Sequence, residues 1–598
     1  MSTNTEDESF HPLGEEWEDQ LTEMLDDTEY DTDLGLAMAE DAQRLVAGEL
    51  SEAEFHGKYH ERVLEEFGED ERPTAEAFAA REDAESGGLL DALASFDGDG
   101  EESRRELMKK MGAGGAFLGL GALATTDNAG NDGVVSADED DTHGTQWGMT
   151  IDLEVCDGCL SCVTACSEEN NLDQGVNWMY VLAYEDSQVS VPDDPDSVRD
   201  YPLLVRPCQH CTDAPCEKVC PTTARHTRSK DGLVLTDYDI CIGCRYCQVA
   251  CPYGVNYFQW DEPDVSESDI EAQAQEMGMD GDHIHADGRP VDSRAPRGVM
   301  SKCTFCPTRQ DGYSGDDKVG TTACMDACPP GAIQFGDVND ETSDASIYSR
   351  SPALGRALEE EVDDAPDPET LAEQLQGESD LGLDGLLELI EEGEAAEEDA
   401  DEAEDEADEA AEEAEEDEDD EEAQEEAEEA EEEAEEAREE ADEFSAITDL
   451  DRELIGLLGA VSIYTDDWDV DTDDSRERAL GPLIGKARDL VGVLEEAGVD
   501  FEDDDTRQDL RLGDGSAGAA EERLQSAKGT HESRFKLLED IGTNPNVTYI
   551  GHEPGPDAEQ VPGPVAYELS YNRADGSSPS LVDDRKDVLD ESTVGGFF

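Results

Sequence analysis

Apolar residues near the start of the chain recur at helical intervals. Ser51-Glu52-Ala53-Glu54 has the form of a capping box, in which a serine and a glutamate satisfy each other's backbone N–H groups at the start of a helix. Two apolar stripes follow helical spacing: Trp17, Leu21 and Leu25, and then Phe55, Tyr59, Val63, Leu64 and Phe67. We therefore predict a small helical domain over residues 1–99, with these stripes as its core and no catalytic constellation.

The pattern changes farther along the chain. Residues 125–145 are polar and rich in Asp, Gly and Thr, as in a linker. Residues 341–528 contain further helical pieces around an acidic low-complexity stretch, 391–443. Residues 529–553 predict a helix-like piece followed by a strand at NPNVTYIG. Residues 554–598, rich in Gly, Pro, Asp and Ser, predict an extended, partly disordered tail.

The low-complexity stretch contains alanines at alternating spacings of four and three, which is a heptad pattern. Alanine buries little apolar area, and like charges at i, i+4 oppose the helix. We therefore favour a solvated linker helix or a disordered spacer over a coil that docks on a partner. The alanines are Ala423, Ala427, Ala430, Ala434, Ala437 and Ala441.

The chain is acidic throughout its length. It carries 159 Asp and Glu against 39 Lys and Arg, a net charge of −120. The stretch 391–443 holds 36 acids and one base, so about −85 remains on the other residues. Self-repulsion on this scale is largely screened only near molar salt, where the Debye length is about 3 Å. The composition is therefore typical of an extreme halophile, and the lack of a basic patch disfavours nucleic acid as a partner.

All 16 cysteines lie in one region and form four groups. The first and third groups have the C-x2-C-x2-C-x3-C spacing of bacterial ferredoxins, in which three thiolates of one loop bind one cluster and the fourth binds its partner cluster. A proline follows the last cysteine in every group except the first, where Ser167 follows. The groups are Cys156, Cys159, Cys162 and Cys166; Cys208, Cys211, Cys216 and Cys220; Cys241, Cys244, Cys247 and Cys251; and Cys303, Cys306, Cys324 and Cys328.

Other uses of these cysteines fit less well. Structural zinc prefers paired C-x2-C units, a pattern that the fourth group alone matches, and disulfides need no such spacing. Sixteen cysteines fill four cubes with none left over, so we predict four [4Fe–4S] clusters. No nucleophile–base pair, phosphate loop or dinucleotide motif is present, so we predict an electron carrier without its own substrate site. His210 is expected to be a packed or hydrogen-bonding loop residue, because the ligand count is already full.

The spacing partly determines which cysteines share a cluster. Groups two and three are neighbours in the sequence, and exchange of their fourth ligands joins Cys220 to the third group and Cys251 to the second. Groups one and four then exchange Cys166 and Cys328 in the same way. Spacing alone leaves open a second scheme, in which group one pairs with group two and group three with group four.

Four stretches resemble a known family. WGMTIDLEVCDGCLSCVTACSEENN, RPCQHC…APCEKVCP, DGLVLTDYDICIGCRYCQVACPYGVNYFQW and KCTFC…ACMDACPPGAIQFGDVND are similar to the four-cluster electron-transfer subunits of the dimethyl sulfoxide reductase superfamily, including those of polysulfide and tetrathionate reductases. LLEDIGTNPNVTYIG resembles the closing helix and strand of that family. The resemblance covers about residues 146–340 and 529–553, supports the nested exchange, and makes residues 341–528 an insertion into one domain.

The resemblance also implies a fold and partners. The expected fold is α+β, with two bacterial-ferredoxin-like double-cluster units in one domain. The expected partners are a molybdenum- or tungsten-pterin catalytic subunit on one side and a quinone-reacting integral membrane subunit on the other. A free-standing polyferredoxin is the alternative, and a zinc-binding interaction module is a distant third. A stable complex on purification would favour the first hypothesis over the second.

Five basic residues stand near the cysteines: Arg206, Arg225, Arg245, Lys302 and Arg309. A cluster with four thiolates is anionic, so a nearby cation could raise its reduction potential. Ordinary surface ion pairing is the competing interpretation.

Residues 100–124 resemble a twin-arginine export signal at an unusual position. Ser103-Arg104-Arg105-Glu106-Leu107-Met108-Lys109 precedes an uncharged stretch, and Ala122-Leu123-Ala124 offers a cleavage site; a buried Gly/Ala helix is the alternative. Iron–sulfur proteins acquire clusters inside the cell, and this route exports folded proteins. We therefore predict residues 125–598 at the outer face of the cytoplasmic membrane, held peripherally, with a cytoplasmic location as the alternative. The N-terminal helical domain would stay inside, or be lost on cleavage.

Overall fold

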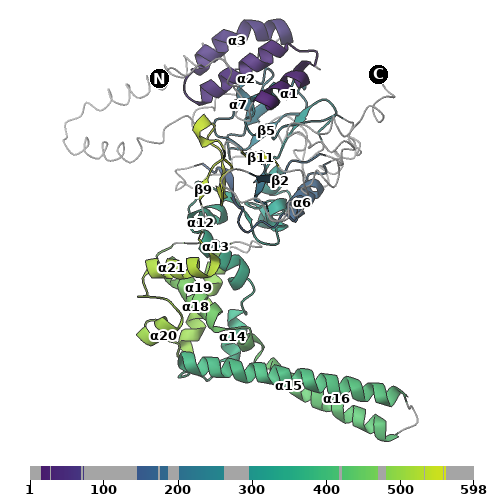
Figure 1. Ribbon diagram of the computed structural model, residues 1–598, viewed down its shortest axis with the longest axis vertical. Helices are drawn as coiled ribbons and strands as arrows, with labels where there is room; N and C mark the ends of the chain where they lie inside the picture. Colours follow the sequence, from purple (N-terminus) through teal and green to yellow (C-terminus); the bar gives the residue numbers. More distant parts are fainter. Residues whose placement is uncertain are drawn as a thin grey trace, which may run out of the picture.

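Three bodies follow one another from top to bottom of Figure 1: the N-terminal helices, a mixed domain with all the cysteines, and a helical body that ends in a long hairpin. The computed structural model describes residues 15–26, 28–68, 70, 72, 144–172, 176–185, 201–260, 295–416, 421–468, 470, 480–530, 533–555 and 558–560. The signal-like segment and almost all of the predicted linker lie outside the described residues.

The N-terminal helices form where the sequence predicts them. They are α1 (Glu15–Asp26), α2 (Thr32–Val46) and α3 (Glu52–Phe67). The predicted capping box is confirmed: the Glu54 N–H donates to the Ser51 hydroxyl, and the Ser51 N–H donates to the Glu54 carboxylate. Gly68 ends α3 in the left-handed conformation, at φ 79°. The side chains of Leu21, Leu25 and Tyr59 are almost completely buried, as the apolar stripes predict, whereas Leu64, also in a predicted stripe, is 40% exposed.

These helices are not a separate domain, because they share one apolar core with the cysteine domain. Gly35 of α2 packs against the ring of Tyr246, whose hydroxyl donates to the Asp31 carbonyl at 2.7 Å. Lys218 forms an ion pair with Glu52 at 2.7 Å. The expectation that export separates these helices from the cysteine domain does not fit this packing, because separation would expose the shared core.

The central sheet of the cysteine domain has the strand order β8-β1-β10-β9. β1 (Trp147–Asp152) pairs antiparallel with β8 (Ile333–Asp337) and parallel with β10 (Val547–Ile550), and β10 pairs antiparallel with β9 (Arg534–Phe535). The predicted strand at NPNVTYIG is therefore confirmed. Because β10 follows residues 341–528 in the sequence but adjoins β1, those residues are inserted into a single domain.

Short elements surround this sheet and carry the cysteine loops. The strands include an edge strand from the predicted tail, β11 (Glu559–Gln560), which pairs with β2 (Tyr180–Glu185). The remaining elements are α6 (Ser161–Glu169), β2 (Tyr180–Glu185), β3 (Leu203–Arg206), α7 (Pro215–Lys218), β4 (Arg225–Thr227), β5 (Val234–Thr236), α8 (Tyr246–Ala250), β6 (Tyr257–Phe258), β7 (Met300–Ser301), α10 (Pro307–Gln310), η2 (Asp316–Lys318), α11 (Ala323–Asp326) and β11 (Glu559–Gln560).

The predicted closing helix is wrong. The segment before β10 contains β9 and a single 3-10 turn, η4 (Glu539–Ile541), in place of a longer helix. Leu538 and Gly542, on either side of the turn, adopt positive φ angles of 51° and 87°. A right-handed helix cannot continue through such residues.

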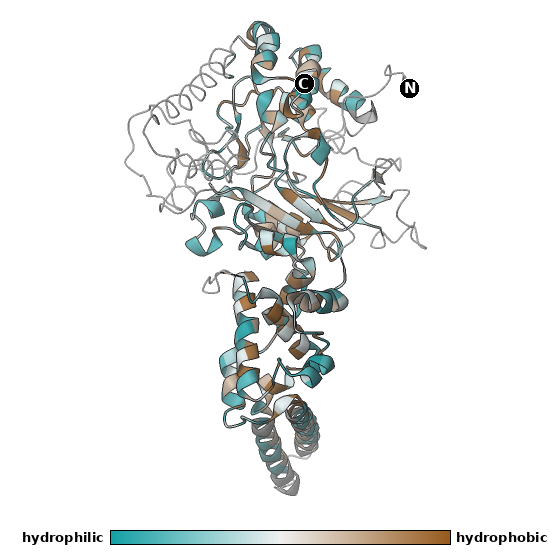
Figure 2. Cartoon of the chain, turned by 90° about the vertical axis from the view of Figure 1, so that its left-hand side faces the viewer, coloured by the Kyte–Doolittle hydropathy of each residue, from teal (hydrophilic) through white to brown (hydrophobic). Residues whose placement is uncertain are grey.

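The insertion forms a helical body with an apolar core of its own. Figure 2 shows apolar residues concentrated in the central strands and among the helices of this body. Its elements are α12 (Asp344–Arg350), α13 (Pro352–Ala357), η3 (Leu358–Val362), α14 (Pro368–Gln374), α15 (Gly382–Glu416), α16 (Glu421–Asp442), α17 (Ser445–Thr448), α18 (Arg452–Thr465), α19 (Leu480–Glu496), α20 (Asp504–Asp509) and α21 (Ala517–Lys528).

The acidic low-complexity stretch forms a hairpin of two packed helices, α15 and α16 (Figure 1). Ala400, Ala434 and Ala441 are buried between or beneath them, while the acidic side chains face outward. The single base of this stretch, Arg438, binds Asp401 and Glu404 across the hairpin at 3.1 and 2.8 Å. The described part of the stretch is therefore helical and solvated, and not a disordered spacer, and its heptad alanines allow two helices of this chain to approach closely.

Candidate metal centres

Three cavities of the cysteine domain are each lined by four cysteines. Each contains three cysteines of one sequence group and the fourth cysteine of another. The quartets, named here by their first residue, are the Cys241 quartet (Cys241, Cys244, Cys247 and Cys220), the Cys208 quartet (Cys208, Cys211, Cys216 and Cys251) and the Cys303 quartet (Cys303, Cys306, Cys324 and Cys166).

The four remaining cysteines also lie together. Burial raises the pKa of Cys328, to about 12. The neighbouring Cys156 and Cys159 add to the rise. Cys162 interacts in the same way with Cys156, Cys328 and Cys159. These four residues form the Cys156 quartet. The structure thus brings the predicted cysteines together in the grouping of the nested exchange and not of the alternative scheme.

Each quartet neighbours the next in a series. Burial raises the pKa of Cys162 well above its usual value, and Cys324 of the Cys303 quartet adds to the rise. Burial and then Cys208 raise the pKa of Cys303, to about 12. Burial raises the pKa of Cys216, in the Cys208 quartet. Cys247 of the Cys241 quartet adds to the rise. The order is therefore Cys156 quartet, Cys303 quartet, Cys208 quartet, Cys241 quartet, which we call the cysteine path.

The loops turn backbone N–H groups toward the sulfurs. Gly243 has φ 66° and lies so close to the Gly298 carbonyl that an added Cβ would be 2.0 Å from its oxygen, so only glycine fits. Backbone N–H groups of His210 and Arg225 lie 3.4 Å from the sulfurs of Cys208 and Cys220. Such bonds lower the pKa of several of these thiols against the effect of burial, as Val255 does at Cys251. Backbone N–H groups directed at a sulfur atom stabilise its negatively charged thiolate form.

The donor set fits iron–sulfur clusters. All 16 cysteines are free, so none is used in a disulfide. Most of them are buried, and a bound metal would deprotonate the thiols outright. Four sulfurs around a cavity, with backbone N–H groups directed at them, form the expected ligand set of a [4Fe–4S] cluster.

The space between the Cys303 and Cys208 quartets is filled by buried residues. His210 is fully buried, stacks on Phe305 with ring centroids 3.9 Å apart, and its Nδ1 accepts from the Val234 N–H at 3.0 Å. Its Nε2 then carries the proton and donates to the Cys303 carbonyl at 3.0 Å. Burial lowers the pKa of His210 well below its usual value, and the charge of Lys302 adds to this effect. His210 is therefore the packed, hydrogen-bonding loop residue that the sequence predicts.

Side chains that sequence reasoning missed also contact sulfurs, and two of them contact sulfurs of the Cys303 quartet. The Asn170 amide lies 3.6 Å from Cys166 Sγ, and the Thr322 hydroxyl lies 3.2 Å from Cys324 Sγ. Cys166 lies on α6, and Asn170, four residues later, lies just beyond its end. A polar residue at i+4 from the cysteine was therefore the available signal. Thr322 precedes the fourth-group cysteine by two residues.

The two ends of the cysteine path differ. At one end Cys159 is exposed. At the other end the N-terminal helices cover part of the Cys241 loop: Tyr30 donates to the Ile242 carbonyl at 3.4 Å and Arg245 to the Met24 carbonyl at 3.4 Å. Ile240 and Ile242, on the same loop, are among the exposed large apolar residues.

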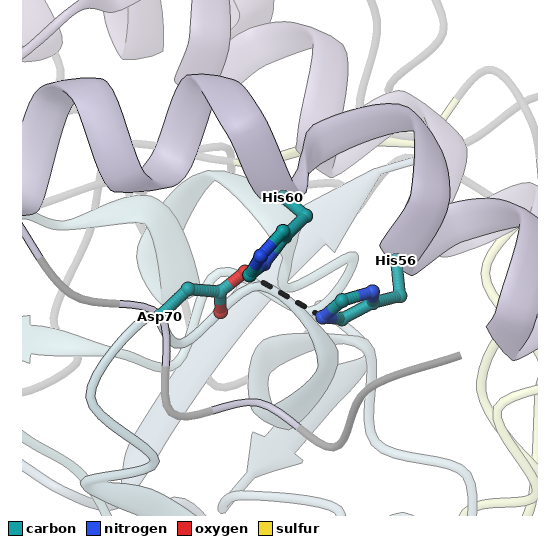
Figure 3. A group of neighbouring side chains, drawn as sticks. All are labelled: His56, His60 and Asp70. Carbon is teal, nitrogen blue, oxygen red and sulfur yellow. Dashed lines mark hydrogen bonds and ion pairs between the residues drawn. The ribbon is translucent and has the colours of Figure 1, made fainter. Parts of the chain in front are cut away.

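A second group of potential ligands lies in the N-terminal helices and is better explained by packing. Figure 3 shows His56 and His60 on successive turns of α3 facing Asp70. His60 Nδ1 is 2.8 Å, and His56 Nε2 3.7 Å, from Asp70 Oδ2. Arg72 donates to both Asp70 oxygens at 2.7 and 2.8 Å, so the carboxylate charge is already balanced. The group joins residues 70 and 72 to α3.

No helix in the described part of the chain has both the length and the apolar character needed to cross a membrane.

Two family models match parts of the chain. One, described as the N-terminal region of 4Fe-4S ferredoxin iron-sulfur binding, matches residues 11–75 and so covers the N-terminal helices. The other, described as a 4Fe-4S dicluster domain, matches residues 200–286, which contain the second and third cysteine groups.

Several known proteins are similar to the cysteine domain. An iron-sulfur subunit assigned to a dimethyl sulfoxide reductase of Halobacterium salinarum is 38% identical over 232 residues, which cover 37% of this chain and 77% of the relative. The iron-sulfur cluster-binding subunit of a menaquinone reductase from Nitratidesulfovibrio vulgaris is 34% identical, over 36% of this chain and 84% of its own length. An arsenate respiratory reductase iron-sulfur subunit from a Shewanella species is 36% identical, over 33% and 85%.

Proposed function

The chain belongs to the family of iron–sulfur electron-transfer subunits of respiratory reductases, and from this premise we propose that it holds four [4Fe–4S] clusters, one in each cysteine quartet. The observation that carries the proposal is that the cysteines come together in four quartets, three of which each line a cavity, and that these quartets neighbour one another in series. A carrier that moves electrons between two partners needs such an order, whereas four independent zinc sites would not.

Each [4Fe–4S] cluster, once bound by four cysteines, accepts and releases one electron at a time and offers no open position to a substrate. The residues of the chain set the conditions for that transfer. Loop N–H groups stabilise negative charge on the sulfurs. His210, Phe305 and Lys302 fill the space between neighbouring quartets and keep water from it. The chain is thus an electron-transfer subunit and not the catalytic one.

We propose that the two ends of the cysteine path face different partners, a molybdenum- or tungsten-pterin catalytic subunit and a quinone-reacting integral membrane subunit. The names of the relatives support this, since they are subunits of reductases and one is a menaquinone reductase. The two unlike ends, with exposed Cys159 and with the partly covered Cys241 loop, also favour two distinct partners. A free-standing polyferredoxin would not require them.

The experiment is affinity purification of the full chain from solubilised membranes in high salt, with mass spectrometry of the bound proteins. The proposal predicts stoichiometric recovery of a pterin-containing catalytic subunit and a polytopic membrane subunit. Recovery of a monomer that still reduces and oxidises would favour the polyferredoxin alternative. The terminal substrate is a property of the catalytic subunit recovered.

We further propose export by the twin-arginine route to the outer face of the membrane. The arginine pair at 104 and 105 and the uncharged stretch after it support this. The packing of α1–α3 on the Cys241 loop adds a condition: the helices and the cysteine domain lie in the same compartment. Arg104→Lys with Arg105→Lys should retain the protein in the cytoplasm, and the exported wild-type protein should yield peptides from residues 15–68. Unchanged localisation would defeat the proposal.

A high-salt environment is the remaining part of the proposal. The net charge of −120 and the similarity to a Halobacterium salinarum protein support it. We expect the unfolding temperature to fall as potassium chloride is lowered from about 3 M to about 0.1 M, because the Debye length then rises from a few Å to about 10 Å. Equal stability at both salt concentrations would contradict a halophilic adaptation.

A further inference from the structure

The structure separates the basic residues that stand near the cysteines. Arg309 is held by two carboxylates, Glu169 at 2.9 Å and Asp326 at 2.6 Å, as in ordinary ion pairing. Lys302 donates to the carbonyl oxygens of Val234 and Cys303. Arg225 differs from both, because its guanidinium is buried without a carboxylate among its contacts in the described part of the chain.

Arg225 lies between the two quartets at one end of the cysteine path. Its Nη2 donates to Asn256 Oδ1 at 2.8 Å and lies 3.8 Å from Cys247 Sγ. Its backbone N–H lies 3.4 Å from Cys220 Sγ, so the residue contacts the Cys241 quartet through both backbone and side chain. Asn256, which accepts the hydrogen bond from the Arg225 side chain, lines the cavity of the neighbouring Cys208 quartet.

Two donors of this guanidinium have no partner among the described residues. Nε and Nη1 of Arg225 are buried and form no hydrogen bond there, although the side chain is only 1% exposed. The residue lines the cavity of the Cys241 quartet. A buried arginine with unsatisfied donors is strongly unfavourable unless an anionic acceptor faces it. The proposed function places an anionic [4Fe–4S] cluster in the cavity that Arg225 lines.

We infer that Arg225 is the fixed counter-charge of the Cys208 and Cys241 clusters and raises the reduction potential of both. The inference rests on the proposed function. One-electron reduction makes a cluster more negative by one charge, and a nearby permanent cation stabilises the more negative state. Asn256 positions the guanidinium, since its Oδ1 accepts from Arg225 while its Nδ2 donates to the Cys247 carbonyl at 3.0 Å.

The test uses the full chain, purified without oxygen in high salt, with Arg225→Gln, Arg225→Lys and Arg309→Gln variants. Reduction is followed by an EPR-monitored redox titration. The signals of the two clusters are assigned by their loss in Cys216→Ala and Cys247→Ala. Arg225→Gln keeps hydrogen-bonding capacity but removes the charge. Arg225→Lys keeps the charge but loses the planar fork, and Arg309→Gln removes a base whose charge is already paired.

Arg225→Gln should shift the reduction equilibrium of both clusters at least tenfold toward the oxidised form, which is 59 mV for a one-electron couple. Arg225→Lys should shift them much less, and Arg309→Gln should leave these two couples unchanged. If Arg225→Gln loses these two clusters while the other two remain, and Arg225→Lys retains all four, the counter-charge role is equally supported. Unchanged potentials in Arg225→Gln with four intact clusters would overturn the inference while leaving the proposed function in place. Absence of clusters in the wild-type chain would overturn the proposed function itself.

Discussion

The guanidinium of Arg356 binds the carboxylate of Asp152 through two hydrogen bonds, Nε to Oδ2 at 2.7 Å and Nη2 to Oδ1 at 3.0 Å. Asp152 ends β1 just before the first cysteine loop, and Arg356 lies on α13 of the insertion. The Tyr348 hydroxyl donates to the same carboxylate at 3.0 Å. A buried, bidentate ion pair thus joins the insertion to the sheet that supports the Cys156 quartet.

Arg356→Met should therefore destabilise the protein by about 3–5 kcal/mol, because it leaves the Asp152 carboxylate buried without its counter-charge. The measurement is urea unfolding at constant high salt. Adding Asp152→Asn to Arg356→Met removes both charges and should recover much of the loss. A loss below about 1 kcal/mol in Arg356→Met would show that the insertion is not fastened to the sheet at this point.

The N-terminal helices should depend on a single glycine at their contact with the Cys241 loop. An added Cβ at Gly35 would lie 2.7 Å from Tyr246 Cε1 and 2.9 Å from Leu25 Cδ1, whereas one at Gly57 of α3 meets no atom within 4 Å. Gly35→Ala should destabilise by about 1–3 kcal/mol through overpacking and hasten the loss of cluster absorbance in air. Gly57→Ala, the matched control, should stabilise by about 0.5–1 kcal/mol, since alanine favours the helix. Equal behaviour of the two variants would refute the contact.

If the fourth ligands are exchanged, Cys220→Ala and Cys251→Ala should each alter the cluster of the other cysteine's sequence group. Cys220→Ala should alter the EPR signal of the cluster held by Cys241, Cys244 and Cys247, although Cys220 belongs to another sequence group. Cys251→Ala should in turn alter the cluster held by Cys208, Cys211 and Cys216. Low-temperature EPR of both variants, compared with Cys244→Ala and Cys211→Ala, decides the matter. If Cys220→Ala instead matched Cys211→Ala, the exchange would be wrong.

The distal part of the acidic hairpin should be dispensable for the fold. Replacing residues 401–438 by a short Gly-Ser turn removes helices whose mutual contact is an alanine seam, and leaves the apolar core of the insertion intact. We expect an unfolding free energy within about 1 kcal/mol of wild type, because alanine buries little apolar area. Leu386→Ala, at a fully buried position in the first part of α15, should cost about 2–5 kcal/mol. A collapse of stability in the shortened chain would mean that the hairpin supports the core.

The sequence predicts the cysteine quartets well because ligand spacing is a local property. Three cysteines of each quartet come from one sequence group, and exchange of the fourth follows from neighbouring groups. Helix caps are equally local, and Ser51 with Glu54 forms the predicted box. The same holds for the strand at 547–550, whose β-branched and aromatic residues mark it.

Long-range packing is the part that could not be predicted from the sequence. Nothing around Gly35 or Tyr246 in the sequence indicates that the two residues meet, so the sequence alone predicts a separate N-terminal domain. The alanines of the acidic stretch indicate the correct period but not the second helix, because alanine burial alone does not predict association. Arg225 and Arg309 likewise look alike in sequence, and only their buried surroundings separate an unpaired cation from a paired one.

The central claim is that four [4Fe–4S] clusters occupy the four cysteine quartets, and metal analysis combined with EPR of the full chain tests it most directly. The protein should be purified without oxygen in high salt, assayed for iron, sulfide and zinc, and then reduced stepwise. The account predicts about 16 irons and about 16 sulfides per chain, with EPR signals that broaden as neighbouring clusters become reduced together. Stoichiometric zinc, with no visible absorbance and no EPR signal on reduction, would contradict it.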